Sequence, residues 1–145
     1  MTIRGFTLLE LLVVIAIIGI LSSIGVVAYN GYTESAAQKA AENSLQAMTI
    51  AQQEYKSNNG TYFTTGGTSG TCSPTQVTTS AIVGSSTAPS TPGLFGGTDN
   101  LTSQRYYFCT TADSSSYKLT AKHNSKTCEI TLTNFNIWNR TGCDG

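Results

Sequence analysis

The sequence predicts an α+β fold in which one long N-terminal α-helix packs against a small antiparallel β-sheet. Three observations support this prediction: an apolar run at the start, an amphipathic pattern that continues it without any proline before Cys72, and three strand-like runs near the C-terminus. The 145 residues are enough for one domain of ordinary size.

The first thirty residues hold a long apolar run. It begins at Phe6, contains Glu10 as its single acid, and has no charged residue from Leu11 to Thr33. A helix rises about 1.5 Å per residue, so residues 6–28 are long enough to cross a hydrocarbon core of roughly 30 Å. The run therefore predicts a transmembrane helix, or an apolar helix that packs with copies of itself.

The charges around this run predict its orientation. Arg4 precedes the run and the next basic residue is Lys39, which predicts a cytoplasmic N-terminus and an external remainder. A cleaved secretory signal, with a small-residue site at residues 26–28, and a plain membrane anchor are the alternatives. Neither needs Glu10, because an acid in an apolar helix costs about 2–3 kcal/mol on insertion scales and usually has a function.

The residues around the start of the run carry a resemblance to a known family. Residues 5–10, GFTLLE, follow a short basic leader and resemble the class III signal of type IV pilins and pseudopilins. The resemblance implies that residues 1–5 are a leader, which a membrane prepilin peptidase removes by cleavage between Gly5 and Phe6. It also implies N-methylation of Phe6 and filament assembly by inner-membrane pilus machinery.

Glu10 is expected to act in filament assembly. Cleavage gives Phe6 a positive amine, and a neighbouring subunit's Phe6 ammonium can neutralise a carboxylate that would be costly by itself in low dielectric. An incidental acid near the lipid interface is the alternative. Many pilins carry a proline near Val27, which this chain lacks, so no proline kink is predicted. Gly19 and Gly25 are expected to permit local unwinding, since Gly weakens a helix by about 1 kcal/mol relative to Ala.

The helical pattern continues beyond the apolar run. Over residues 29–56 apolar residues recur at three- and four-residue spacing, with Gln52 as the polar exception. This pattern predicts an amphipathic helix that belongs to the globular part of the protein, residues 29–145, which we call the head. The stop signal SNNG at residues 57–60 predicts a helix from Phe6 to about Lys56. Residues 57–100 then indicate a Gly/Ser/Thr-rich surface loop, with a short strand expected near residues 76–83.

Three runs in residues 101–145 predict β-strands, at residues 104–110, 116–122 and 127–133. In the last two runs apolar residues alternate with polar ones, so one sheet face should cover the helix and the other should face water. His123 lies where a turn is expected and should be exposed. Residues 134–139 are expected to form an edge strand or a wedge under the loop. We expect Trp138 in the core, and an exposed binding residue is the alternative.

Four cysteines lie in the predicted external part of the chain: Cys72, Cys109, Cys128 and Cys143. An even count in this location predicts two disulfides, and the sequence alone allows three ways to pair them. We favour Cys72 with Cys109 and Cys128 with Cys143, and the second pair resembles the disulfide-bounded C-terminal region of pilins. A zinc site is the alternative, but the chain lacks any C-x-x-C pair and no metal is predicted.

Composition and resemblance together restrict the function. Eight basic residues balance eight acids, which argues against a dedicated nucleic-acid binder. The single His argues against a multi-histidine metal site and against a catalytic triad. The sequence therefore predicts no catalytic residue and no cofactor. The resemblance implies a structural pilus subunit, with a single-pass inner-membrane precursor that assembles into a surface filament for adhesion, motility or DNA uptake.

Two alternatives to this function stay open. One is a minor pilin with an adhesive or DNA-binding role, for which residues 101–145 offer only a small excess of basic side chains. The other is a pseudopilin of a type II secretion system. The resemblance implies an acidic calcium site near the C-terminus for such a protein, and Asp144 is the only acid available there.

Overall fold

The computed structural model describes residues 5–66, 71–84, 93–98, 101 and 105–143. The chain divides into two units, residues 1–36 and residues 37–145. Helix α1 comprises Leu8–Asn59. Its first part, residues 8–36, belongs to the first unit, and its second part, residues 37–59, belongs to the second unit. None of the helices in the described ranges is both long enough and apolar enough to cross a membrane.

Helix α1 ends at the stop signal that the sequence predicts. Asn59 is its last residue, and Gly60 follows with a φ of 78°. Glycine takes this left-handed conformation readily because it has no Cβ, and its N–H donates to the carbonyl oxygen of Lys56 at 2.8 Å. The helix begins at Leu8 rather than at Phe6, and it ends at Asn59, three residues beyond the predicted Lys56 and inside the stop signal.

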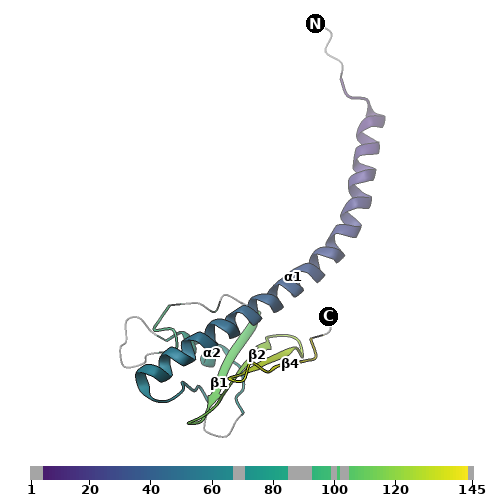
Figure 1. The fold of residues 1–145 in the computed structure, drawn as a ribbon. Coiled ribbons are helices and arrows are strands. Elements are labelled where there is room, and N and C mark those ends of the chain that lie inside the picture. Colours follow the sequence, from purple (N-terminus) through teal and green to yellow (C-terminus); the bar gives the residue numbers. More distant parts are fainter. Residues whose placement is uncertain (1–4, 67–70, 85–92, 99–100, 102–104, 144–145) are drawn as a thin grey trace. The chain divides into compact units, whose positions relative to one another are not determined.

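In the part of the chain that the structure describes, four strands form one antiparallel sheet in the order β1-β2-β3-β4 (Figure 1). Each strand pairs with its neighbour in the sequence, so the sheet is a meander. The three predicted strands are confirmed with bounds that shift by up to two residues, and residue 104 of the first prediction lies outside the described residues. In the tail, the edge strand begins at Trp138, and residues 134–137 precede it. The strands are β1 Tyr106–Ala112, β2 Tyr117–His123, β3 Glu129–Thr133 and β4 Trp138–Thr141. Together with α1 they confirm the predicted α+β fold.

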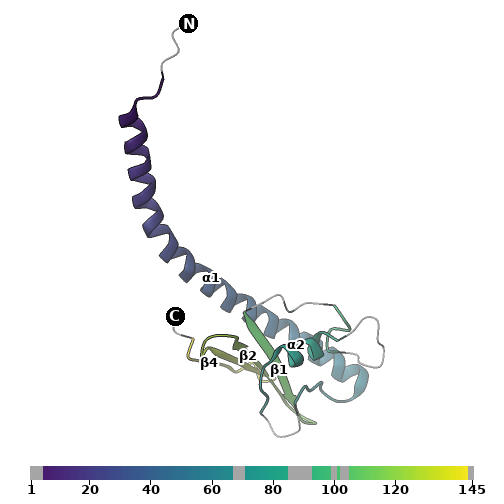
Figure 2. The same cartoon turned by 180° about the vertical axis from the view of Figure 1, so that it is seen from behind.

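The second part of α1 packs on one face of this sheet, as both views show (Figures 1 and 2). Its buried apolar residues recur at helical spacing, and β2 and β3 contribute alternate residues from the facing side. Burying these two faces against each other is the main stabilising contribution in this unit. The core comprises Ala41, Leu45, Met48, Ile82, Leu94, Leu101, Tyr106, Phe108, Tyr117, Leu119, Ala121, Cys128, Ile130 and Leu132.

Gln52, the polar exception in the α1 stripe, is fully buried. Its side-chain amide pairs with the backbone of Phe63, accepting from the Phe63 N–H at 2.9 Å and donating to the Phe63 carbonyl at 2.8 Å. The same amide nitrogen donates to Thr110 Oγ1 at 3.0 Å. Gln52 therefore satisfies backbone groups that would be costly to bury without partners, and it links α1 to β1.

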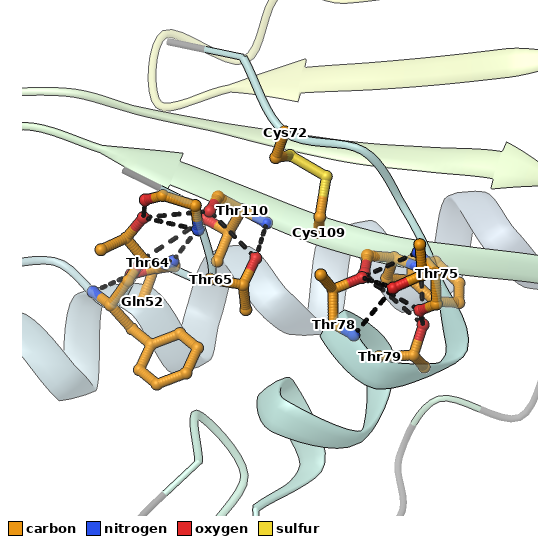
Figure 3. The surroundings of a disulfide bond; sticks show 12 residues. Gln52, Thr64, Thr65, Cys72, Thr75, Thr78, Thr79, Cys109 and Thr110 are labelled. Atoms are coloured by element: carbon orange, nitrogen blue, oxygen red, sulfur yellow. Dashed lines mark hydrogen bonds between the residues drawn. A yellow bond between two sulfur atoms is a disulfide. The ribbon is translucent and has the colours of Figure 1, made fainter. Parts of the chain in front are cut away.

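Segment Gln76–Val83 is helix α2, which corrects the strand predicted there. Thr75 caps it: Thr75 Oγ1 accepts from the Thr78 N–H at 3.2 Å, and Thr78 Oγ1 accepts from the Thr75 N–H at 2.8 Å. The β-branched residues favour a strand locally, but the helix brings two threonines to the edge of β1 (Figure 3). Thr78 Oγ1 donates to the Phe108 carbonyl at 2.7 Å, and Thr79 Oγ1 accepts from the Phe108 N–H at 2.8 Å.

His123 is buried, which corrects the exposed position expected for it. It is the last residue of β2, and its ring meets the ring of Tyr106 edge-on with centroids 5.1 Å apart. Its Nδ1 accepts from the backbone N–H groups of Ser125 and Lys126, each at 3.0 Å. In β2 every second residue faces the core, and this alternation continues through Ala121 to His123. The alternation is the feature of the sequence that could have predicted a buried His123.

The turn between β3 and β4 exposes two apolar side chains. Phe135 is 73% exposed and Ile137 is 61% exposed. Asn136 lies between them with a φ of 59°, and its N–H donates to the Thr133 carbonyl at 2.9 Å. Trp138 is half-buried and packs against the core, so the core position expected for it is only partly reached.

Candidate processing and assembly site

The segment before α1 presents its backbone to solvent. Phe6 is 88% exposed, and Gly5 is exposed as well. A Cβ added at Gly5 would meet no described atom within 4 Å, and Gly5 is not among the residues with positive φ. The structure of this unit therefore does not require a glycine at position 5, and the bond between Gly5 and Phe6 is accessible.

Glu10 forms a reciprocal cap with Thr7 at the N-terminus of α1. Glu10 Oε2 accepts from the backbone N–H and from the hydroxyl of Thr7, each at 3.0 Å. In return, Thr7 Oγ1 accepts from the Glu10 N–H at 3.3 Å. This is a capping box, in which a threonine and a glutamate three residues later satisfy N–H groups that the helix itself cannot pair. The pattern T-x-x-E before an apolar run was visible in the sequence as a helix start.

Large apolar side chains surround the first part of α1 on all sides. They are exposed in this unit, with Leu8 at 82% and Leu21 at 64%. A helix that is apolar all round is normally buried by lipid or by other protein segments, because exposed apolar surface is unfavourable in water. The exposed set in this stretch comprises Leu8, Leu9, Leu11, Leu12, Val13, Val14, Ile15, Ile17, Ile18, Ile20 and Leu21.

The two glycines expected to permit unwinding lie inside helical α1. A Cβ added at Gly19 or at Gly25 would meet no described atom within 4 Å. Neither glycine is therefore required by a close contact within this unit. Their role in local unwinding stays a prediction.

The disulfide between Cys72 and Cys109 ties the segment before α2 to β1 (Figure 3). Their Cα atoms are 6.1 Å apart, and Cys109 is fully buried. On the same strand the carbonyl of Thr110 accepts from the backbone N–H of Thr65 at 2.9 Å, and the N–H of Thr110 donates to Thr65 Oγ1 at 2.9 Å. One edge of β1 is therefore covered by segments of the predicted loop.

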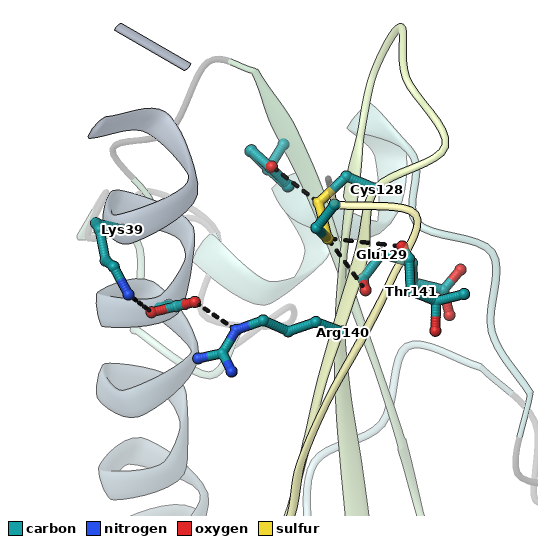
Figure 4. Close-up of polar contacts among 8 residues, drawn as sticks. Lys39, Cys128, Glu129, Arg140 and Thr141 are labelled. Atoms are coloured by element: carbon teal, nitrogen blue, oxygen red, sulfur yellow. Dashed lines mark hydrogen bonds and ion pairs between the residues drawn. A yellow bond between two sulfur atoms is a disulfide. The ribbon is translucent and has the colours of Figure 1, made fainter. Parts of the chain in front are cut away.

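The second disulfide joins Cys128 to Cys143 and encloses β3 and β4 (Figure 4). Their Cα atoms are 4.2 Å apart, and the hydroxyl of Tyr106 donates to Cys128 Sγ at 3.2 Å. Both disulfides match the pairings that we favour from the sequence. This bridge holds the edge strand β4 next to the rest of the sheet.

Glu42 joins α1 to β4 within the second unit (Figure 4). Its carboxylate accepts from Arg140 Nε at 2.8 Å and from Lys39 Nζ at 2.9 Å. Burial by itself raises the pKa of Glu42, but the hydrogen bonds from Arg140 and Lys39 outweigh burial and hold the pKa below its usual value. The Arg140 guanidinium also lies 5.7 Å from the centre of the Trp138 ring.

Within the described ranges, no group of three or more His, Cys, Asp or Glu side chains is arranged to hold a metal ion. Asp144, the acid weighed for a calcium site, lies outside those ranges. The arrangement around the N-terminus offers instead an accessible peptide bond, a carboxylate and a long apolar surface. These features suit cleavage of that bond and association through the apolar surface.

Residues 1–26 match a family model described as the prokaryotic N-terminal methylation motif. The chain carries this methylation motif. The match includes Gly5, Phe6 and Glu10, and it supports the resemblance to prepilin-like proteins.

Curated relatives extend the likeness beyond the methylation motif. The chain is 36% identical over 74 residues to a fimbrial protein of Neisseria meningitidis, and 38% identical over 71 residues to the type IV major pilin protein PilE1 of Neisseria gonorrhoeae. It is 45% identical over 62 residues to the type II secretion system core protein G of Escherichia coli. These matches cover 51%, 49% and 43% of this chain. They cover 44%, 43% and 43% of the relatives, so the chain spans less than half the length of the curated relatives it matches.

Proposed function

We propose that the chain is a structural subunit of a bacterial type IV pilus. The observation that carries this proposal is the methylation motif over residues 1–26, followed by a helix whose apolar side chains are exposed all round. A helix of this kind is suited to move from lipid to a filament core, because both surroundings bury apolar surface. Matches to a fimbrial protein and to a major pilin support the same function.

Processing by a prepilin peptidase is the first step of the proposal. Hydrolysis of the Gly5–Phe6 bond releases residues 1–5 and leaves a free amine on Phe6, which the same enzyme then methylates. The exposure of Phe6 and the absence of a structural need for glycine at position 5 support this site. Before cleavage, residues 6–28 hold the precursor in the inner membrane with the short N-terminus on the cytoplasmic side.

Polymerisation through α1 is the second step. In the filament core water is scarce, and an ionised Glu10 requires a partner. The Phe6 ammonium of a neighbouring subunit supplies that charge, and the pair sets the axial register of the two helices. The Thr7 hydrogen bonds can occupy the Glu10 carboxylate until the neighbour arrives. The disulfide-bonded head then faces the outside of the filament.

Mass spectrometry of sheared surface filaments tests this function. We expect a chain that begins at N-methylated Phe6, lacks residues 1–5 and contains two disulfides. A dominant band indicates a major pilin, and a trace band indicates a minor one. Full-length chain that stays in the membrane fraction, with none in the filaments, would contradict the proposal.

A pseudopilin of a type II secretion system is the second candidate. The match to a type II secretion system core protein favours it, since that protein shares 45% identity over 62 residues. Deleting the gene distinguishes the two functions, because a pilus subunit is required for surface filaments and a pseudopilin for protein secretion. Normal filaments with lost secretion would favour the pseudopilin.

A further inference from the structure

A cavity of about 250 Å³ lies on the sheet beside the β1–β2 turn. Three of its lining residues form a row across three strands: Thr111 is paired with Lys118, and Lys118 is paired with Thr133. Residues directly opposite each other project from the same face of a sheet. Leu119, the neighbour of Lys118 on β2, is buried in the core, so this row lies on the face away from α1.

Polar groups around this cavity have hydrogen-bonding capacity that the fold does not use. Among the described residues, neither the Lys118 ammonium nor the Asn134 side-chain amide has a hydrogen-bond or ion-pair partner. Asp113 also lines the cavity, and its Oδ2 accepts one hydrogen bond, from Ser116 Oγ at 2.7 Å. The site therefore offers a strong donor, a strong acceptor and an amide that can do both.

Phe135 adds an apolar wall to these polar groups. It lines the cavity, and 73% of its surface is exposed. The face of an aromatic ring carries partial negative charge, so it attracts the weakly positive C–H groups of a flat, partly apolar ligand. An aromatic wall beside several donors and acceptors matches the two kinds of surface on a pyranose, its C–H face and its hydroxyl edge.

We propose that this cavity binds one neutral hexopyranose ring at the end of a glycan. The volume fits a single ring, since it lies below the roughly 300 Å³ at which pockets for larger organic ligands begin. The charges of Lys118 and Asp113 offset each other, so the site does not select an anion. This inference concerns the head alone and does not depend on how the chain assembles.

Saturation-transfer NMR on the full chain tests the proposal, in a zwitterionic detergent without a sugar headgroup. The probes are methyl α-D-galactopyranoside and methyl α-D-glucopyranoside, with N-acetylneuraminic acid and a twelve-nucleotide thymidine strand as contrasts. We expect transfer to the C–H protons of at least one neutral glycoside, and a dissociation constant in the millimolar range because the ligand is small.

Variants in the β3–β4 turn and at Lys118 on β2 localise the binding. Phe135→Ala should weaken it by about tenfold, and Phe135→Tyr should retain it because the ring stays. Lys118→Met should weaken it too, while Ile137→Ala is the matched control, an exposed apolar residue of the same turn that does not line the cavity. The proposal is overturned if neither glycoside receives transfer, if only the acid sugar or the oligonucleotide does, or if Phe135→Ala binds like the wild type.

Discussion

At the scale of single residues, Glu10 serves its own helix in this structure and a neighbouring subunit in the proposed filament. The capping box with Thr7 uses the carboxylate as a hydrogen-bond acceptor, a role that a neutral amide oxygen can also fill. Pairing with a Phe6 ammonium instead needs the negative charge. The two roles can therefore be separated by substitution.

Substitutions at Glu10 and Thr7 distinguish the charge from the cap. Glu10→Gln keeps an acceptor for Thr7 but loses the charge, whereas Thr7→Ala keeps the charge and loses the cap. If the charge drives assembly, Glu10→Gln and Glu10→Val should each lower filament yield by at least about tenfold, since an unpaired buried ammonium is left behind. Thr7→Ala should assemble at near the wild-type level. The yield is measured as the sheared fraction of total subunit.

Processing provides the control for this series. All three variants should still begin at Phe6, because the Gly5–Phe6 bond is unchanged. Wild-type filament yield from Glu10→Gln would show that the charge is not needed. A Thr7→Ala yield as low as that of Glu10→Gln would assign Glu10 to the cap.

Glu42 gives the stability of the second unit a pH dependence. Its folded-state pKa lies below the unfolded value of 4.5, so ionised Glu42 stabilises the fold. This stabilisation is complete above the unfolded pKa and is lost as the pH falls through the lower folded-state pKa. Glu42→Gln should lower the free energy of unfolding by about 1 kcal/mol at neutral pH, with the difference vanishing in acid. Urea unfolding of both proteins across pH measures this.

Asp113 is the matched comparison for Glu42. Hydrogen bonds from the Ser116 side chain and from the Ser115 and Ser116 backbone lower the pKa of Asp113 to about 2. The contribution of Asp113 should therefore be lost only as the pH falls from the unfolded value of 3.8 towards about 2. An unchanged pH profile in Glu42→Gln would show that the contacts with Arg140 and Lys39 do not stabilise the fold.

At the scale of elements, α2 depends on one threonine that caps it and on two that attach it to β1. Thr75→Ala removes the cap and should lower the free energy of unfolding by about 1 kcal/mol. Urea unfolding measures the loss, and hydrogen exchange should show faster opening of Gln76–Val83. Ser73→Ala is the control, because Ser73 is exposed just before the cap. Equal stability of the two variants would contradict the cap.

At the scale of the whole molecule, the two disulfides close loops of different length around the same sheet. Cys72 and Cys109 are 37 residues apart, and Cys128 and Cys143 are 15 residues apart. A longer loop restricts the unfolded chain more, so the bridges should contribute about 4 and about 3 kcal/mol in the entropic model. Replacing each pair by alanines and measuring urea unfolding tests this ranking. A larger loss from the shorter loop would contradict the entropic explanation.

The N-terminal methylation motif, helix α1 and the strands were predictable from the sequence because their signals are local. The apolar run, the three- and four-residue spacing and the stop at Gly60 reflect the geometry of one helix. Alternation in β2 and β3 reflects the geometry of a strand. If the alternation predicted for residues 116–122 is extended by one residue, it places His123 on the buried face of β2.

The tertiary structure decided what local patterns leave open. The composition of residues 76–83 predicts a strand, but the segment is a helix. In this conformation its threonines form hydrogen bonds with the backbone at the edge of β1. Gln52 forms hydrogen bonds with Phe63 and Thr110, and Glu42 forms one with Arg140. Phe135 and Lys118 line the same cavity. The residues in each of these sets are separated along the sequence. Such partners depend on how the chain folds back on itself. Local patterns in the sequence were therefore enough to predict the helix and the motif at its start, whereas tertiary packing selected the polar contacts of the second unit, because those contacts join residues far apart in the chain.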